Sequence, residues 1–259
     1  MYDKLKYEVQ DGIAILQINN AEKMNALSFQ IIRDLGDFVS KIEADKSLRA
    51  LVIWGNEKIF GAGADLQDVV GVKTVKEAYE SAHRTHLIYN RIENLQIPTI
   101  AAIAGYALGA CFELSLACDL RIASKKAKFG LPEISLGIMP GGGGSQRLAK
   151  LVGTSRAKEL MFFGTVIDVN EAYRLGIVNR IVEVDTVFDE AMKMAGQFSG
   201  LAPRALEMIK AAVDLGCTMQ QVPSMEHEAR CFSVLFDTED ANEGITAFLE
   251  KRKPTFTGK

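Results

Sequence analysis

Two glutamates in apolar surroundings are the residues of this 259-residue chain best suited to acid–base chemistry. Glu113 lies on the expected first turn of an apolar helix that runs toward Cys118, and Glu133 lies in a loop beside Leu131 and Ile134. Burying an unpaired carboxylate costs several kcal/mol or shifts its pKa, so each position requires a reason. Either glutamate alone could be structural, one favoured by a helix dipole and the other capping loop amides. Together they favour an acid–base pair.

Two glycine-rich turns could supply hydrogen-bond donors beside these carboxylates. Residues 60–66 follow a strand expected at 50–54, and residues 105–110 follow one expected at 99–104. Small residues let a ligand approach the backbone, and a helix start leaves its first amide hydrogens without partners. Taken singly, each turn is better explained as structural. If the turns face each other, they would direct two N–H groups at one developing negative oxygen.

Several familiar motifs are incomplete in this sequence. Residues 61–63 lack the third glycine of a dinucleotide-binding loop, and residues 141–145 lack the lysine that ends a phosphate-binding loop. Ser145 has no glycine two residues on, so it is not in a nucleophile elbow. His83 and His86 lie one turn apart on a polar helix, and no other residues clearly complete a metal site with them. We therefore expect no metal centre.

Composition excludes several classes of protein. The net charge is −3 and the pI is about 5.8, which disfavours nucleic acid or an anionic membrane as the main partner. No apolar run reaches membrane-spanning length, and the first residues lack the pattern of a signal peptide. The four cysteines form no Cys-x-x-Cys pair, so reduced, buried thiols are expected. These features predict a cytoplasmic protein.

Strand and helix patterns alternate through most of the chain. An antiparallel hairpin is expected over residues 7–18, followed by a helix that Ser28 caps. The remaining body is expected to contain a long helix at 74–95, strands at 120–123 and 178–184, a loop at 128–143, and helices near 144–151, 155–163 and 169–175. Beyond residue 186 only helical patterns appear, near 187–198, 203–215, 223–236 and 238–252. We therefore predict a core of residues 1–195 and a helical region of residues 196–259.

Four sequence blocks resemble those of the crotonase superfamily. They are Lys23–Leu27, Phe60–Leu66, Gly105–Asp119 and Pro132–Leu148, and they occur in the order and at the distances usual for that family. The similarity is closest to enoyl-CoA hydratases and covers essentially the whole chain. It implies an α/β fold of the ClpP/crotonase type, a spiral of ββα units followed by a helical C-terminal region used in trimerisation. It also implies a homo-oligomer, a trimer or a hexamer made of two trimers.

The resemblance also implies roles for individual residues. The backbone N–H groups of Ala64 and Ala110 would form the oxyanion hole for an acyl-CoA thioester. Glu113 and Glu133 match the two glutamates that hydratases carry, with Glu113 acting as the base toward water and Glu133 donating a proton to Cα. The path of coenzyme A would be lined by Lys23, Ala62, Gly63, Asp65 and Leu66.

The activity implied is the syn addition of water to a trans-2-enoyl-CoA, giving 3-hydroxyacyl-CoA in fatty-acid or related acyl-CoA degradation. Coenzyme A belongs to the substrate, and no separate cofactor is expected. An enoyl-CoA isomerase is the main alternative, since it can operate with one glutamate at the position of Glu133. An acyl-CoA thioester hydrolase and a non-catalytic, RNA-binding member of the fold are further alternatives. The pair of glutamates and the acidic pI favour the hydratase.

Two departures from the family pattern bear on the substrate. The family often has Gly-Gly-Gly-Cys-Glu where this chain has Gly109-Ala110-Cys111-Phe112-Glu113. Ala110 keeps its amide hydrogen, but its methyl group and Phe112 are expected to crowd the acyl pocket. Gln67 stands where hydratases often have a lysine near the coenzyme A phosphates. That contact is expected to weaken or move.

Overall fold

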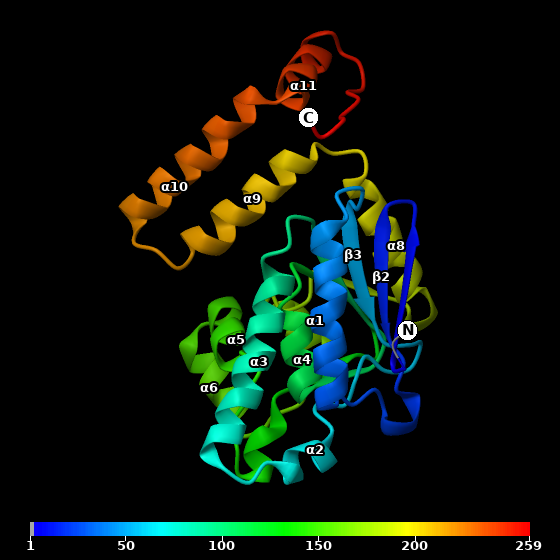
Figure 1. Ribbon diagram of the computed structural model, residues 1–259, viewed down its shortest axis with the longest axis vertical. Coiled ribbons are helices and arrows are strands. Elements are labelled where there is room, and N and C mark those ends of the chain that lie inside the picture. The colour runs from blue at the N-terminus through cyan, green and yellow to red at the C-terminus, as the bar shows by residue number, and fades with distance from the viewer. Residues whose placement is uncertain (1–2) are drawn as a thin grey trace.

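A six-stranded sheet forms the centre of the computed structural model, which describes residues 3–259 (Figure 1). Its strand order is β1 (Leu5–Gln10), β2 (Ile13–Ile18), β3 (Ala50–Trp54), β4 (Thr99–Ile103), β6 (Leu120–Ser124) and β9 (Arg180–Val182). β1 and β2 are an antiparallel hairpin, and every other neighbouring pair is parallel. The predicted hairpin and the predicted strands of this sheet are confirmed.

A smaller sheet was missed by the sequence analysis. It consists of β5 (Tyr106–Leu108), β7 (Lys128–Gly130) and β8 (Ile167–Asp168), in the order β5-β7-β8. β7 and a 3-10 helix (Pro132–Leu136) occupy the segment predicted as one continuous loop, so that prediction was wrong. Strands of two or three residues are too short to show a period-2 pattern, and their pairing depends on distant segments of the chain.

Helices cover both faces of the large sheet. On one face, Val52 and Ile100 pack with Ala191 of α8 (Val187–Phe198). On the other face, Leu51 and Ile53 belong to the main hydrophobic cluster, which includes residues of α1 (Phe29–Ala44), α3 (Val75–Glu93) and α4 (Gly109–Leu116). Parallel strands that are buried on both faces read as continuous apolar runs, which is why β3 and β4 were evident in the sequence.

Local capping explains where the main helices begin. Ser28 Oγ accepts a hydrogen bond from Ile31 N at the start of α1, and Thr74 forms a capping box with Glu77 at the start of α3. α4 has no side-chain cap and starts directly at Gly109. Glu113 is therefore on its second turn, and the prediction of a first-turn position was wrong. The other helices of the body are α2 (Leu66–Gly71), α5 (Gly144–Val152), α6 (Thr154–Phe162) and α7 (Val169–Arg174).

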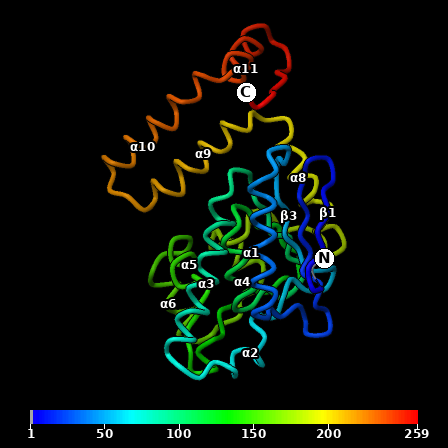
Figure 2. The backbone as a smooth tube through the Cα atoms, in the orientation of Figure 1, coloured from blue at the N-terminus to red at the C-terminus, as the bar shows by residue number. Residues whose placement is uncertain are grey.

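Three helices form an arm that extends away from the sheets. α9 (Pro203–Gly216) and α10 (Gln221–Ser233) make a helical hairpin, and α11 (Glu239–Leu249) follows near the C-terminus (Figures 1 and 2). The predicted helices of this region are confirmed. α8 crosses residue 195 and packs on the sheet, and the division into two domains at that residue stays a prediction. No helix within residues 3–259 is long and apolar enough to cross a bilayer.

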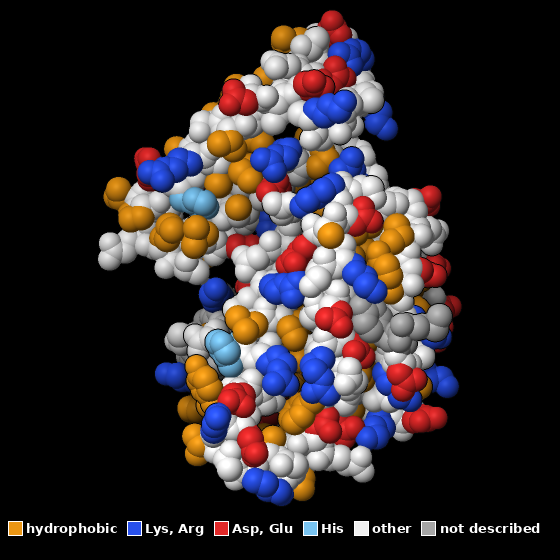
Figure 3. Space-filling model, viewed as in Figure 1, with side chains coloured by type: hydrophobic (Ala, Val, Ile, Leu, Met, Phe, Trp, Pro, Cys, Tyr) orange, Lys and Arg blue, Asp and Glu red, His pale blue; other side chains and the backbone are white. Residues whose placement is uncertain are grey.

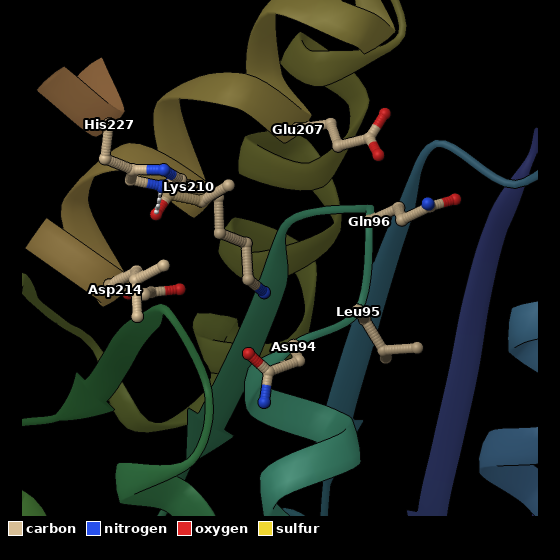
Figure 4. A pocket seen from close by; sticks show the side chains of 9 residues that line it. Asn94, Leu95, Gln96, Glu207, Lys210, Asp214 and His227 are labelled. Carbon is tan, nitrogen blue, oxygen red and sulfur yellow. Dashed lines mark hydrogen bonds between the residues drawn. The ribbon is translucent and has the colours of Figure 1, made fainter. Parts of the chain in front are cut away.

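Lys210 connects the arm to the body. Its Nζ donates to Asp119 Oδ2 at 2.8 Å, and the same oxygen accepts from Thr99 N at the start of β4. A cavity of about 310 Å³ lies beside this contact, lined by residues of α9, residues after α3, and His227 of α10 (Figure 4). Asp119 carries the chain from α4 into β6, so the arm is anchored close to the end of the helix that carries Glu113.

Candidate active site

A glycine-rich loop holds the carboxylate of Glu113. The side chain is 2% exposed, and its Oε1 accepts hydrogen bonds from Gly142 N and Gly144 N, each at 2.8 Å. These donors belong to the glycine run at residues 141–144, which the sequence analysis had considered only as an incomplete phosphate-binding loop. Four consecutive glycines before a helix were the available signal, because such a segment exposes backbone donors.

Glu133 approaches the start of α4 from the 3-10 helix. A Cβ built on Gly109 would lie 3.0 Å from Glu133 Oε1, so the carboxyl group lies against the backbone of this glycine. Gly109 has a φ of 47°, which glycine adopts without strain. Glu133 Oε2 is buried and has no hydrogen-bond partner among residues 3–259. A carboxyl oxygen in this state favours the protonated form over the ion.

The environments of the two carboxyl groups differ. Burial raises the pKa of Glu133 to about 7; its own backbone amide lowers it, and the charge of Glu113 raises it further. Burial also raises the pKa of Glu113, but the amides of Gly144 and Gly142 and the charge of Arg147 oppose that rise. Two loop amides and a cation favour the ionised form of Glu113, whereas only its own backbone amide does so for Glu133. The pair therefore favours a state with one proton and one negative charge, because the charge of Glu113 raises the pKa of Glu133.

The two glycine-rich turns touch each other. A Cβ built on Gly109 would lie 3.6 Å from Gly63 Cα. Leu27 N donates to Gly63 O, and Asp65 N donates to Leu27 O, which leaves the N–H of Ala64 pointing to the opposite side of the segment. Ala110 is the second residue of α4, so its N–H has no partner within the helix. The turns that carry these two N–H groups therefore meet at Gly109, which itself lies against the Glu133 carboxyl group.

Lys23 closes one side of the turn at residues 60–66. Its Nζ donates to Asp65 Oδ2 at 2.6 Å and to Gln67 Oε1 at 2.9 Å. Asp65 Oδ1 also caps α2 by accepting from Gln67 N. The hydrogen bond from Lys23 and that from the Gln67 amide lower the pKa of Asp65. Gln67 stands where the family often has a lysine, and here it accepts a hydrogen bond from Lys23. The Lys23 side chain is 47% exposed.

Phe112 is not placed as the sequence analysis expected. Its ring is 1% exposed and packs in the core, 5.5 Å from the ring of Phe129. The expectation that Phe112 crowds the acyl pocket was therefore wrong, because the α4 face that carries it points into the core. Cys111 is also buried, with its Sγ 3.6 Å from both Gly63 O and Asn25 O. Of the three variant residues, only Ala110 is partly exposed.

Tyr89 and Arg147 were not recognised from the sequence as part of this site. Tyr89 is fully buried on α3 and donates its hydroxyl hydrogen to Ala110 O at 3.0 Å. Arg147, on α5, donates to Gly142 O at 3.1 Å. His83, in contrast, stacks on Tyr79 on α3, and no group of three potential metal ligands is found in the described part of the chain.

The fold and the paired carboxyl groups define a crotonase-type enzyme. A family model described as enoyl-CoA hydratase/isomerase matches residues 8–259, and the chain belongs to that family. It is 39% identical over 259 residues to a crotonyl-CoA hydratase of Syntrophomonas wolfei, which covers 100% of this chain and 99% of the relative. The predicted superfamily is thereby confirmed.

Other relatives agree with this assignment. The chain is 37% identical to a short-chain-enoyl-CoA hydratase of Clostridium acetobutylicum, over 95% of this chain and 94% of that protein. A crystal structure of an enoyl-CoA hydratase from Bacillus anthracis superposes with a TM-score of 0.94 at 33% identity, covering 99% of this chain and 100% of that one. The predicted crotonase-type α/β fold with a helical C-terminal region is confirmed.

Proposed function

We propose that this chain adds water in the syn sense to a trans-2-enoyl-CoA and forms the 3-hydroxyacyl-CoA. The observation that carries the proposal is the contrast between Glu113, held by two amide donors, and Glu133, whose Oε2 has no partner among the described residues. A hydration needs one base and one acid near the same double bond. Relatives named crotonyl-CoA hydratase and short-chain-enoyl-CoA hydratase support the same reaction.

The reaction begins with the thioester oxygen between the N–H groups of Ala64 and Ala110. Glu113 accepts a proton from water as the water oxygen bonds to Cβ, and the electron pair of the double bond moves toward the thioester. The two donors stabilise the enolate oxygen, and each such donor is worth about 10²–10³ in rate. Glu133 then supplies the proton that bonds to Cα. The water proton on Glu113 returns to Glu133 through solvent, which restores both groups.

An enoyl-CoA isomerase remains the second candidate, since the family model names both activities. An isomerase moves one proton between carbons and needs no group to activate water. The two amide donors on Glu113 favour hydration, because they orient a second carboxyl group and oppose the rise in pKa that its burial causes. A thioester hydrolase would use the same donors but would release free coenzyme A thiol.

The test is a panel of trans-2-enoyl-CoA esters, from crotonyl-CoA to long chains, assayed with the purified protein. Hydration removes the conjugated double bond, so the absorbance of the enoyl thioester falls while no free thiol appears. A thiol reagent and a 3-enoyl-CoA substrate separate the hydrolase and the isomerase from the hydratase. Failure to hydrate any ester of the panel would overturn the proposal.

The proposed substrate also indicates a metabolic role and a cellular compartment for the protein. Coenzyme A enters as part of the substrate, along Lys23 and residues 62–66, and a role in fatty-acid or related acyl-CoA degradation fits that substrate. The four cysteines are free thiols, which suits a reducing cytoplasm.

The arm supports assembly into a trimer, or a hexamer of two trimers. Apolar side chains gather along α9 and α10 (Figure 3). The most exposed of them on the arm include Ile209, Val213, Val222, Met225, Phe232 and Phe248. Such a large exposed apolar surface marks an interaction site. A second copy of the chain can cover it, and symmetric homo-oligomers are the commonest assemblies.

A further inference from the structure

Arg147 joins the end of α3 to the loop that holds Glu113. We propose that Arg147 is a positioning residue, which holds the carbonyl oxygen of Gly142 and thereby fixes the loop whose Gly142 and Gly144 N–H groups donate to Glu113. The inference deepens the proposed hydratase function and rests on it for its catalytic meaning. Arg147 itself touches no reacting atom.

Two nitrogens of the Arg147 guanidinium group donate hydrogen bonds to side chains of α3. Arg147 Nε and Nη2 donate to Glu93 Oε2 at 3.0 and 2.7 Å, and Nη2 also donates to Asn90 Oδ1 at 2.6 Å. The side chains of Arg147 and Glu93 are 8% and 28% exposed. A paired, mostly buried guanidinium has a defined orientation, because its planar fork must match both acceptors.

The third guanidinium nitrogen, Nη1, donates to the glycine loop at residues 141–144. Arg147 Nη1 donates to Gly142 O at 3.1 Å, while Gly142 N donates to Glu113 Oε1 at 2.8 Å. Gly142 thus lies between the two side chains and is held at both its carbonyl oxygen and its N–H. The neighbouring Gly143 has a φ of 101°, and a Cβ there would collide with the Arg147 guanidinium. The loop conformation therefore depends on the arginine as well as on the glycines.

The positive charge of Arg147 also acts on Glu113. The titratable groups that face Glu113 are Glu133 from the 3-10 helix, Tyr89 from α3, Cys111 from α4 itself and Arg147 from α5. Arg147 is the only cation among them and lowers the pKa of Glu113, whereas the charge of Glu113 raises the pKa of Glu133. Glu93 compensates part of the arginine charge. Burial is the main cause of the raised pKa of Glu113; Arg147 opposes part of that rise, and Glu93 is expected to offset part of the effect of Arg147.

The experiment compares Arg147→Gln, Arg147→Lys and Glu93→Gln in the full-length protein. We expect Arg147→Gln to lower kcat by about 10- to 100-fold, with KM changed by less than about threefold, because the base is misplaced while binding groups remain. The acidic limb of kcat/KM should move upward by about one pH unit. Arg147→Lys keeps the charge, so its limb should stay near the wild-type pH while kcat falls. Glu93→Gln should move the limb downward.

Arg121→Lys is the matched control for a purely structural arginine. Arg121 is 3% exposed and donates to the carbonyl oxygens of Ser115 and Cys118 at the end of α4. This variant is expected to lower Tm without moving the acidic limb. If Arg147→Gln and Glu93→Gln also lower only Tm, Arg147 merely stabilises the fold and the inference is wrong.

A second readout separates the inference from the proposed function. Difference infrared spectra of protein labelled with ¹³C-glutamate follow the Glu113 carboxyl group without any substrate, with Glu113→Gln identifying its band. The band should titrate at higher pH in Arg147→Gln and at lower pH in Glu93→Gln. A wild-type protein without hydratase activity would overturn the function while this titration still tests the role of Arg147. Unchanged titration in an active enzyme would overturn the role of Arg147 alone.

Discussion

Gly142 leaves no room for a side chain beside Glu113. A Cβ at residue 142 would lie 2.5 Å from Glu113 Oε2, and the Gly142 N–H already donates to Oε1 of the same carboxylate at 2.8 Å. A methyl group at this position would push the carboxylate away from its own hydrogen-bond donor. The glycine is thus required both for space and for the orientation of the Glu113 carboxylate.

Gly142→Ala should therefore impair chemistry more than binding. We expect kcat to fall by about 10²-fold, since a displacement of about 1 Å at a reacting group has that effect, while KM changes little. Steady-state kinetics with an active enoyl-CoA ester measure both constants. Gly141→Ala is the matched control, because a Cβ at residue 141 would meet no atom within 4 Å. Equal losses in the two variants would contradict the proposed contact.

Replacing either glutamate by glutamine should remove a proton-transfer group while preserving its shape. Glu113→Gln and Glu133→Gln are each expected to lower kcat by about 10²–10⁴-fold, the usual contribution of general acid–base catalysis. Binding of a CoA ester should remain nearly intact, because neither group is expected to contact the nucleotide. Isothermal titration with a saturated acyl-CoA checks binding independently of turnover. Full activity in either variant would remove that residue from the mechanism.

The raised pKa of Glu133, about 7, predicts that activity and the stability contribution of this residue both decline as pH rises, over different ranges. As the acid, Glu133 must be protonated, so kcat/KM should fall as pH rises through about 7. A glutamate in the unfolded chain has a pKa near 4.3, so between these values the native state binds the proton more tightly. Its contribution to stability therefore declines as pH rises from about 4 to about 7 and changes little above that.

Glu133→Gln removes this titration. The gain in unfolding free energy of the variant over the wild type should be larger at pH 8 than at pH 5, as measured by denaturant unfolding. Glu57→Gln, at an exposed turn, provides the comparison and should show no such pH-dependent difference. A difference that is constant with pH would show that Glu133 titrates as an ordinary exposed glutamate.

Charged substitutions on the apolar surface of the arm should dissociate the proposed oligomer. Ile209 and Met225 are each 61% exposed on α9 and α10. Ile209→Asp and Met225→Asp place charges on the apolar surface, so both should shift the protein from a trimer or hexamer toward the monomer. Light scattering after size-exclusion chromatography measures the mass. Val9→Asp, on the exposed side of the edge strand β1, should leave the mass unchanged. A monomeric wild type would contradict the proposed assembly.

The sequence was most informative where burial and local signals agree. β3 and β4 were predicted from continuous apolar runs, α1 from the Ser28 cap and its 3.6-residue periodicity, and the end of α3 from the following Pro98, because these patterns depend on nearby residues. Glu113 and Glu133 were recognised as unusual from their apolar neighbours alone. Beside the two amide-rich turns they favoured an acid–base pair, and the resemblance to a known family then matched them to the two glutamates of hydratases, although residue patterns could not show that they meet.

Only the tertiary structure decided what surrounds those glutamates. The donors from Gly142 and Gly144 come from 29 and 31 residues beyond Glu113, and Arg147 reaches Glu93 across 54 residues. Such contacts depend on how α3, α4 and α5 pack, which no local pattern encodes. The burial of Phe112 and the short strands of the second sheet were missed for the same reason. Residue types thus determined which groups could do chemistry, and long-range packing decided that Glu113 is held by two backbone donors while Glu133 Oε2 has no partner among the described residues.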